Sequence, residues 1–124
     1  MIDFKNGGLF KLRQVNPNEA EGALELLIPG EAVIDAYKAI RDYVVFTDKR
    51  IIAVNVQGMT GKKKDFTSIP YSKIQLFSVE TSGFFDLDSE LEIYISSIGK
   101  IKFEFTGGCN IKRIAQMIAS FALQ

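Results

Sequence analysis

The middle of the chain is a series of short apolar runs, and the connections between these runs restrict the fold more than any other feature. Three runs between residues 33 and 56 are rich in β-branched and aromatic residues, which favour extended backbone: VIDAYKAI, YVVFT and RIIAVNV. The connections are RD at 41–42 and DK at 48–49. Two residues are enough for a hairpin but too few for a crossover helix. The segment therefore predicts three consecutive antiparallel strands.

The same pattern continues to residue 105 through four more runs: KDFTSIP, IQLFSVE, LEIYI and IKFEF. In the last two runs apolar and polar residues alternate regularly, as expected for strands with one buried face. The apolar set is Leu91, Ile93, Ile95, Ile101, Phe103 and Phe105. The polar set includes Glu92, Tyr94, Lys102 and Glu104.

Helices are predicted at both ends of this series. After Gly107-Gly108, Asn110 can cap a C-terminal helix with an apolar stripe that includes Ile111, Ile114 and Ile118. Before the series, residues 16–30 predict a short helix. It would be capped by Asn16, have Pro17 at its first position, and place Glu19 where a capping box needs an acid. Six or seven strands followed by one helix indicate a small barrel or sandwich closed by that helix.

Composition limits the classes of function. A chain of 124 residues with 47% hydrophobic residues suits one globular domain, and its fifteen basic and fifteen acidic residues predict no nucleic-acid partner. The single cysteine, Cys109, rules out an intrachain disulfide and fits a cytoplasmic protein, and no apolar run approaches a membrane span. Histidine is absent, which removes the commonest general base and metal ligand. We expect no catalytic residues, no cofactor and no metal site.

Two longer segments of the chain are AYKAIRDYVVFTDKRIIAVNVQGMTGKKKDFTSIPYSKI and FSVETSGFFDLDSELEIYI. Both resemble the bacterial PH-domain family of small stand-alone pleckstrin-homology-like proteins. The resemblance implies a mainly β fold, a PH-like barrel or sandwich of about seven antiparallel strands in two orthogonal sheets capped by a C-terminal helix. It also implies ring-like homo-oligomers without an established ligand or activity. On this basis we expect an N-terminal segment with the short helix at 1–30 and a PH-like domain at 31–124.

The basic residues around the second hairpin are the first candidate site. Lys49, Arg50, Lys62, Lys63 and Lys64 could bind a phosphate or an anionic membrane, or could be solvated hairpin residues that discourage edge pairing. Inositol-lipid binding is not expected, because the connection at Arg41-Asp42 is tight and the basic residues do not complete the pattern of the phosphoinositide-binding relatives.

Charge layout and the last helix suggest self-association. Residues 19–35 hold five acids and no base, residues 80–92 hold another five acids and no base, and residues 49–64 hold five bases and no acid. Segregated charge suits head-to-tail contacts between copies, although these segments could equally be solvated faces. The helix carries extra apolar residues that predict an oligomer interface: Met117, Ala119 and Leu123. The sequence thus predicts a non-enzymatic homo-oligomeric scaffold that binds a protein or peptide; the alternative is an anionic membrane-surface or phosphate-ligand module.

Overall fold

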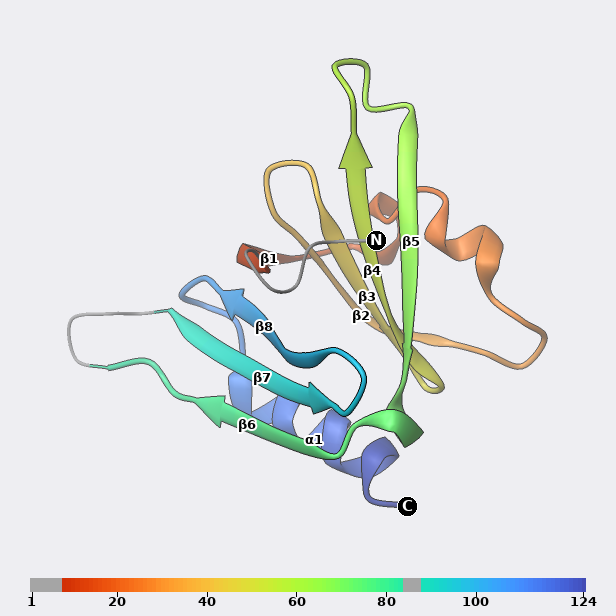
Figure 1. Cartoon of the computed structure of the whole chain (residues 1–124). Coiled ribbons are helices and arrows are strands. Elements are labelled where there is room, and N and C mark those ends of the chain that lie inside the picture. Colours follow the sequence, from red (N-terminus) through yellow and green to blue (C-terminus); the bar gives the residue numbers. More distant parts are fainter. Residues whose placement is uncertain (1–7, 84–87) are drawn as a thin grey trace.

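The computed structural model describes residues 8–83 and 88–124. Within them the seven strands predicted from Val33 onward are all present and are followed by one helix (Figure 1). A further strand, which was not predicted, precedes them. The strands are β1 (Leu9–Val15), β2 (Val33–Lys38), β3 (Tyr43–Thr47), β4 (Arg50–Gln57), β5 (Lys63–Pro70), β6 (Leu76–Glu80), β7 (Ser89–Ile95) and β8 (Gly99–Phe105). The helix is α1 (Ile111–Ala122), and three short 3-10 turns are η1 (Pro17–Glu19), η2 (Ala23–Leu26) and η3 (Tyr71–Lys73).

These strands form one eight-stranded sheet in the order β5-β4-β3-β2-β1-β8-β7-β6. Neighbouring strands are antiparallel except β1 and β8, which are parallel. Strand β1 joins the two parts of the sheet, β2 to β5 and β6 to β8. Its residues Arg13–Val15 pair with β2, while Leu9 and Leu12 pair with β8. The sheet bends at β1, so that β6, β7 and β8 lie across the direction of β2 to β5 (Figure 1). The prediction of two separate orthogonal sheets is therefore wrong, because β1 continues the strand pairing across the bend.

A bulge at Lys11 shapes β1. Lys11 has φ 56°, a left-handed conformation that non-glycine residues seldom adopt. The register with β8 shifts between Leu9 and Leu12, which is the signature of one extra residue in the bulged strand. As a result Leu9 and Leu12 are both buried, while Phe10 and Lys11 are both exposed.

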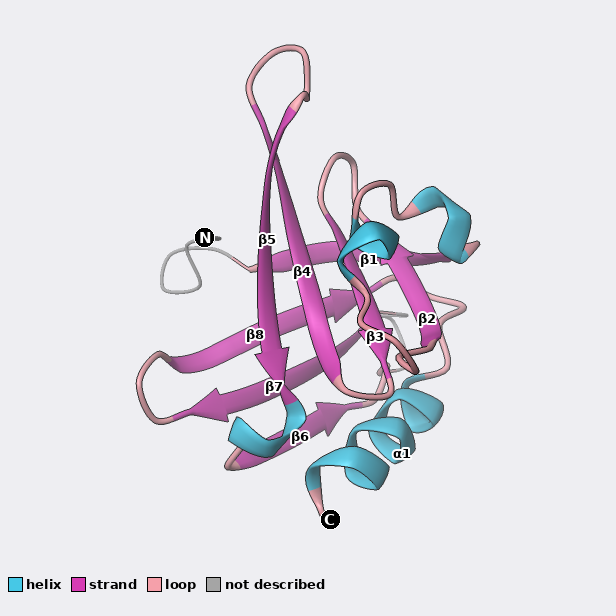
Figure 2. Ribbon diagram, turned by 90° about the vertical axis from the view of Figure 1, so that its right-hand side faces the viewer, coloured by secondary structure: helices cyan, strands magenta, loops and turns pink. Residues whose placement is uncertain are grey.

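The main core lies between the bent sheet and α1. The alternation predicted for β7 and β8 is confirmed, since the inward residues Leu91, Ile93, Ile101, Phe103 and Phe105 are fully buried. The predicted cap is also confirmed: the Asn110 side chain accepts a hydrogen bond of 3.1 Å from the Arg113 amide. Helix α1 packs against β6, β7 and η3 (Figure 2).

A second apolar cluster lies on the outer face of β2 to β5. Segment 17–28, which contains η1 and η2, lies over this face (Figure 2). Its Ala20 and Ala23 are buried together with outward residues of the sheet: Ala36, Tyr43, Val45, Ile52 and Val54. Because this half of the sheet is covered on both faces, all five residues of β3 are buried. The second cover explains why YVVFT is a continuous apolar run.

The predicted N-terminal helix is replaced by two 3-10 turns. Its start was identified correctly, since Asn16 and Glu19 form the expected capping box. The chain then turns at Gly22, whose φ of +85° does not belong to a right-handed helix. A Cβ at Gly22 would lie 2.8 Å from the Phe66 ring, so the close approach of the segment to β5 also requires glycine there.

Candidate interaction surfaces

The predicted basic residues fall into two groups at opposite ends of β4. Arg50 begins β4 and is paired with Pro70, whereas Gln57 ends it and is paired with Lys63. At roughly 3.3 Å per residue, an eight-residue strand separates its ends by about 23 Å. Lys49 and Arg50 therefore do not share a surface with the lysines at 62–64.

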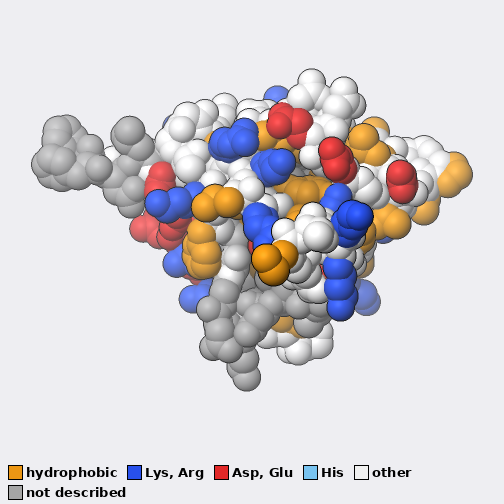
Figure 3. Space-filling model, turned by 90° about the horizontal axis from the view of Figure 1, so that it is seen from above, with side chains coloured by type: hydrophobic (Ala, Val, Ile, Leu, Met, Phe, Trp, Pro, Cys, Tyr) orange, Lys and Arg blue, Asp and Glu red, His pale blue; other side chains and the backbone are white. Residues whose placement is uncertain are grey.

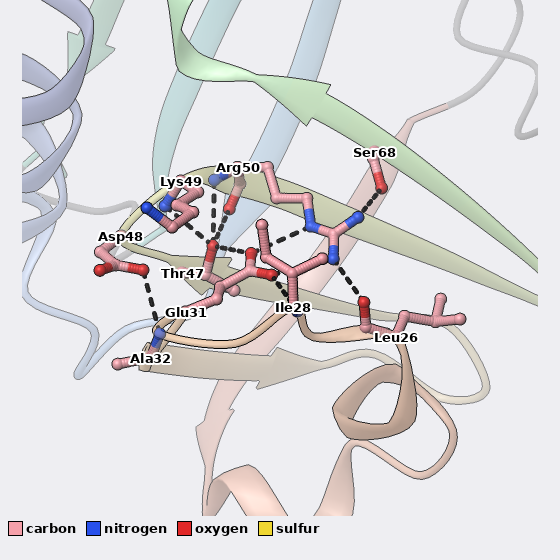
Figure 4. A network of polar contacts seen from close by, with 9 residues as sticks. All are labelled: Leu26, Ile28, Glu31, Ala32, Thr47, Asp48, Lys49, Arg50 and Ser68. Carbon is pink, nitrogen blue, oxygen red and sulfur yellow. Dashed lines mark hydrogen bonds and ion pairs between the residues drawn. The ribbon is translucent and has the colours of Figure 1, made fainter.

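Arg50 is committed to a structural ion pair that we call the Glu31 latch (Figure 4). Its Nε donates to Glu31 Oε2 at 3.0 Å and its second terminal nitrogen donates to Oε1 at 2.9 Å. The same guanidinium donates to Ser68 Oγ at 3.0 Å and to the Leu26 carbonyl at 2.7 Å. The Glu31 side chain is completely buried. Arg50 thus ties the segment that covers the sheet to β4 and β5, and it is not available to a ligand.

The β3–β4 turn completes the latch. The Thr47 hydroxyl donates to Glu31 Oε2 at 2.6 Å and accepts from the amides of Lys49 and Arg50, each at 3.0 Å. The Ile28 amide donates to Glu31 Oε1 at 3.1 Å. Burial alone raises the pKa of Glu31, but the hydrogen bonds from Arg50, Thr47 and Ile28 outweigh it and hold the pKa at about 2. Glu31 is therefore ionised at neutral pH.

Apolar and basic side chains gather at the other end of β4, on what we call the tip surface. It comprises exposed residues of the β1 bulge, the β2–β3 turn and the β4–β5 turn: Phe10, Lys11, Ile40, Arg41, Met59, Lys62 and Lys63. Ile40 and Met59 are 94% and 103% exposed. Figure 3 looks down on this end and shows hydrophobic side chains among lysines and arginines.

Hydrogen bonds hold the two turns of the tip surface together. The Arg41 guanidinium donates to the Gly58 carbonyl of the neighbouring turn. Asp42 points inward and accepts from the Val56 amide at 2.9 Å and from Asn55 Nδ2 at 3.3 Å. The residues from Gly8 to Lys11 and from Ala39 to Asp42 line a shallow hollow of about 380 Å³. The exposed apolar side chains therefore rest on a fixed frame.

A second exposed apolar group lies on the segment that covers the sheet, and we call it the acidic ridge. Leu24, Leu26 and Ile28 are 38%, 42% and 54% exposed. The exposed acids of the same segment are Glu19, Glu21 and Glu25. The ridge is anchored at both ends, because Tyr43 Oη donates to the Glu21 carbonyl and Arg50 holds the Leu26 carbonyl.

Helix α1 separates its three predicted interface residues. Met117 is 7% exposed and belongs to the core, Ala119 is half-buried, and Leu123 is 72% exposed. The solvent side of α1 carries polar residues: Lys112, Arg113, Gln116 and Ser120. Of the three predicted residues, Leu123 alone offers an exposed apolar side chain.

A polar cluster around Asp35 fastens α1 to the sheet. Asp35 is 4% exposed and receives two hydrogen bonds from Arg113, at 3.1 and 3.3 Å. Gln14 of β1 donates to the same carboxylate at 3.3 Å. Burial, followed by the Asp35 charge, raises the pKa of Tyr37, so its hydroxyl stays protonated beside the carboxylate. These groups bring β1, β2 and α1 together.

In the described part of the chain, Cys109 and the acids of β7 have structural contacts: Lys102 Nζ lies 3.3 Å from Glu90 Oε2, and Lys100 Nζ lies 3.9 Å from Glu92 Oε2. Burial raises the pKa of the Cys109 thiol, whose Sγ donates to the Leu12 carbonyl at 3.7 Å. Among residues 8–83 and 88–124, no three acidic or cysteine side chains form a metal-binding group. The acidic string at 86–92 lies partly outside these residues. In the same ranges no helix combines the length and apolar character needed to cross a bilayer.

Sequence reasoning missed most of the apolar residues of both surfaces. The apolar tip residues, Phe10, Ile40 and Met59, are far from one another in sequence. The ridge residues Leu26 and Ile28 occur in a segment predicted to be a helix. A signal was present at Met59, a large apolar residue between Gly58 and Thr60 in the connection between two predicted strands. A side chain at the tip of such a connection lies outside the core.

Comparison with known proteins places the chain in a family. The model of the bacterial PH domain matches residues 3–122. Two uncharacterized Bacillus subtilis proteins are similar to this chain. YjqA is 59% identical over 76 residues, which are 61% of this chain and 61% of YjqA. YozO is 34% identical over 84 residues, which are 68% of this chain and 71% of YozO. The matched part thus spans 61% of the length of YjqA.

Solved structures of bacterial pleckstrin-homology proteins are also similar to this chain. A DUF1696 family protein with a pleckstrin-homology domain from Shewanella loihica PV-4 is 39% identical, with a TM-score of 0.78 over 94% of this chain and 99% of that one. A pleckstrin homology domain from Shewanella amazonensis SB2B is 40% identical, with a TM-score of 0.66 over 89% and 90%. The resemblance noted in the sequence is therefore confirmed, and the chain belongs to the bacterial PH-domain family.

Proposed function

We propose that this domain is a non-catalytic interaction module that acts as a homo-oligomer and holds a protein or peptide partner. The observation that carries the proposal is the grouping of large apolar side chains outside the core. They collect on the tip surface, beside Arg41, Lys62 and Lys63, and on the acidic ridge, whose Glu21 lies 3.7 Å from Lys64. Single exposed apolar residues are ordinary, whereas groups rimmed by polar residues mark interaction sites.

The strongest polar contacts favour a structural rather than a catalytic use of charge. Glu31 and Asp35, whose side chains are 0% and 4% exposed, are each held by an arginine that links parts of the fold. The Cys109 thiol has a raised pKa, which disfavours the reactive thiolate. The pKa of Glu31, held at about 2, lies far below the range that general acid–base catalysis needs at neutral pH.

A partner peptide has a preferred place on the sheet. The edge strands of the described sheet are β5 and β6. Strand β5 carries Lys63, Lys64 and Pro70, residues that discourage pairing with another strand. Strand β6 is LFSVE, with Leu76 58% exposed and no lysine or proline. An extended peptide can therefore add to β6 through backbone hydrogen bonds.

Size-exclusion chromatography with light scattering tests the oligomer. At tens of micromolar protein we expect a mass several times 13.8 kDa. Added salt should slow assembly more than it dissolves it, because charges mainly steer association while apolar contacts hold it. A monomer mass at that concentration would refute self-association.

Peptide binding is tested with a displayed library of random extended peptides. Selected binders should perturb the backbone amide resonances of Leu76–Glu80 more than those of Lys63–Pro70. Perturbation centred on β5, or a library without binders, would contradict the proposed peptide site.

One observation favours a second function, binding to an anionic membrane surface. Ile40 and Met59 project at the tip beside Lys62 and Lys63, and apolar side chains flanked by bases suit a lipid interface. Flotation with vesicles containing anionic lipid should recover the protein, and changing residues 62–64 to glutamine should abolish recovery. The unfolding free energy should change by less than about 0.5 kcal/mol, as for other surface substitutions. Equal recovery with neutral vesicles would contradict this function.

A further inference from the structure

We propose that the partner segment that adds to β6 runs antiparallel to it, with a basic residue at its amino end and an aromatic residue at its carboxyl end. The inference rests on the peptide site of the proposed function and names the chemistry and direction of the peptide. It is drawn from the outer face of β6, β7 and β8, where paired residues of the three strands form rows across the sheet.

The row at the end of β6 is acidic. Glu80 lies opposite Glu90, and Glu90 lies opposite Glu104 on the next strand. Lys102 Nζ lies 3.3 Å from Glu90 Oε2, whereas within the described part of the chain no ion pair joins Glu80 to a base. Like charges directly opposite one another destabilise a sheet. A base on a strand added beside β6 would lie opposite Glu80 and offset this repulsion.

The other two rows favour different residues. The row through Ser78 continues to Glu92, and the row through Leu76 continues to Tyr94. Leu76 is 58% exposed at the open edge of the sheet. Cross-strand pairs of hydroxyl residues stabilise a sheet, as do pairs of aromatic and other apolar residues. The added segment would therefore place threonine or serine opposite Ser78 and an aromatic residue opposite Leu76.

The inner face of β6 favours apolar residues at the alternate positions. Phe77 and Val79 are half-buried and pack at the border of the main core. Helix α1 packs against β6 and lies behind it in Figure 1. Successive side chains of a strand point to opposite faces of the sheet. The residues of an added strand beside Phe77 and Val79 would therefore extend the apolar layer that faces α1.

The pairing pattern of this part of the sheet selects the direction of the segment. Strands β6, β7 and β8 are antiparallel to one another, and antiparallel pairing is slightly more stable per residue than parallel pairing. The amino end of an antiparallel segment lies at Glu80, and its carboxyl end lies at Leu76. From the amino end, its five positions are therefore basic, apolar, hydroxyl, apolar and aromatic.

The experiment uses the full chain and three peptides with acetylated and amidated ends, each extended by Gly-Ser on both sides. The first contains the proposed order, Arg-Val-Thr-Ile-Tyr. The second contains the reversed order, Tyr-Ile-Thr-Val-Arg, and the third has glutamate in place of arginine in the first. A titration followed by the backbone amide resonances of the protein measures the dissociation constant and the place of binding together.

The first peptide should perturb Leu76–Glu80 and bind about tenfold more tightly than the glutamate peptide, and it should also bind more tightly than the reversed one. Glu80→Lys should remove the preference for arginine over glutamate. The matched control Glu25→Lys makes the same charge change at an exposed acid of the covering segment and should keep the preference. Because each preference is a ratio measured on one variant, a small loss of stability does not alter it.

The outcomes separate the inference from the peptide site itself. If the arginine and glutamate peptides bind at β6 equally tightly, or if Glu80→Lys keeps the preference, the acidic row does not select the segment and the inference is wrong while the site stands. Tighter binding of the reversed peptide would also overturn it. If the designed peptides fail, library peptides that bind at β6 decide the matter, since the inference requires a base on the amino side of their aromatic residue. If no peptide perturbs Leu76–Glu80, the inference and the peptide site are both wrong.

Discussion

Replacing Glu31 with glutamine should remove a large part of the stability of this domain. The unaltered side chain is buried and holds Arg50 through two hydrogen bonds of 2.9 and 3.0 Å. Its pKa falls from 4.5 to about 2 in the folded protein. One pKa unit is about 1.4 kcal/mol, so the ionised carboxylate contributes roughly 3 kcal/mol. The measured cost of breaking a buried ion pair, about 3–5 kcal/mol, is of the same size.

Urea unfolding at pH 7 measures this loss. With a slope of about 1–3 kcal/mol per molar for a small domain, a loss of roughly 3 kcal/mol should lower the midpoint by about 1–3 M. Glu25→Gln is the matched control, since Glu25 is an exposed acid on the same segment, and its midpoint should move by less than about a fifth of that.

The pH dependence gives an independent check on the cause. The contribution of Glu31 is complete above pH 4.5, where the carboxylate is ionised in the folded and the unfolded state. Between pH 4.5 and about 2 the unfolded chain binds the proton first, so this stability disappears as the pH falls. Glu31→Gln should lack this component. A loss below about 1 kcal/mol at pH 7, or identical acid profiles for the variant and the unaltered chain, would refute the reasoning.

Substitutions at three further positions test other features of the fold. Lys11→Gly should raise the unfolding free energy by about 1 kcal/mol, because glycine adopts the left-handed conformation of the bulge without strain; a thermal melt that shows a loss would contradict this. Gly22→Ala should lower the unfolding free energy by about 2 kcal/mol or more, because the new Cβ would lie 2.8 Å from the Phe66 ring and the backbone φ at this position is +85°. An unchanged urea midpoint would show that the segment moves freely. Arg113→Ala should lower the unfolding free energy by about 1–3 kcal/mol, because it leaves the Asp35 carboxylate, 4% exposed, without its arginine. Arg113→Lys should restore only part of this stability, because lysine cannot donate to both carboxylate oxygens at once, and equal stability of the two variants would argue against the pair.

The strands from Val33 onward could be predicted because their residues follow local rules. Period-two alternation and two-residue connections decide the register of β7 and β8 without knowledge of the rest of the chain. Strand β1 could not be predicted in this way. Its sequence LFKLRQV buries Leu9 and Leu12, three positions apart, because the bulge at Lys11 lets both reach one face. A spacing of three does not indicate a strand.

The candidate sites could not be predicted for a related reason: the residues that contact one another there are far apart in the sequence. Arg50 looked like a free base because its partner, Glu31, is nineteen residues earlier in the chain and the two meet only after the covering segment folds over the sheet. The separation of Arg50 from the lysines at 62–64 was available from the sequence, since the strand RIIAVNVQ lies between them. What the sequence could not supply was the contact between the turn at Arg41 and the turn at Gly58, which depends on the folded sheet.

The parallel pairing of β1 with β8 has a consequence for synthesis of the protein. The first described strand finds a neighbour, Phe103 or Phe105, more than ninety residues further along the chain. Topologies that depend on contacts so distant in sequence fold slowly, because a long loop must close before the contacts form. On the ribosome, the hairpins β2 to β5 can pair as they emerge, but the sheet cannot bend into its final shape until β8 has been made. A ribosome-bound chain that ends before Gly99 should therefore remain open to proteases between β1 and β2.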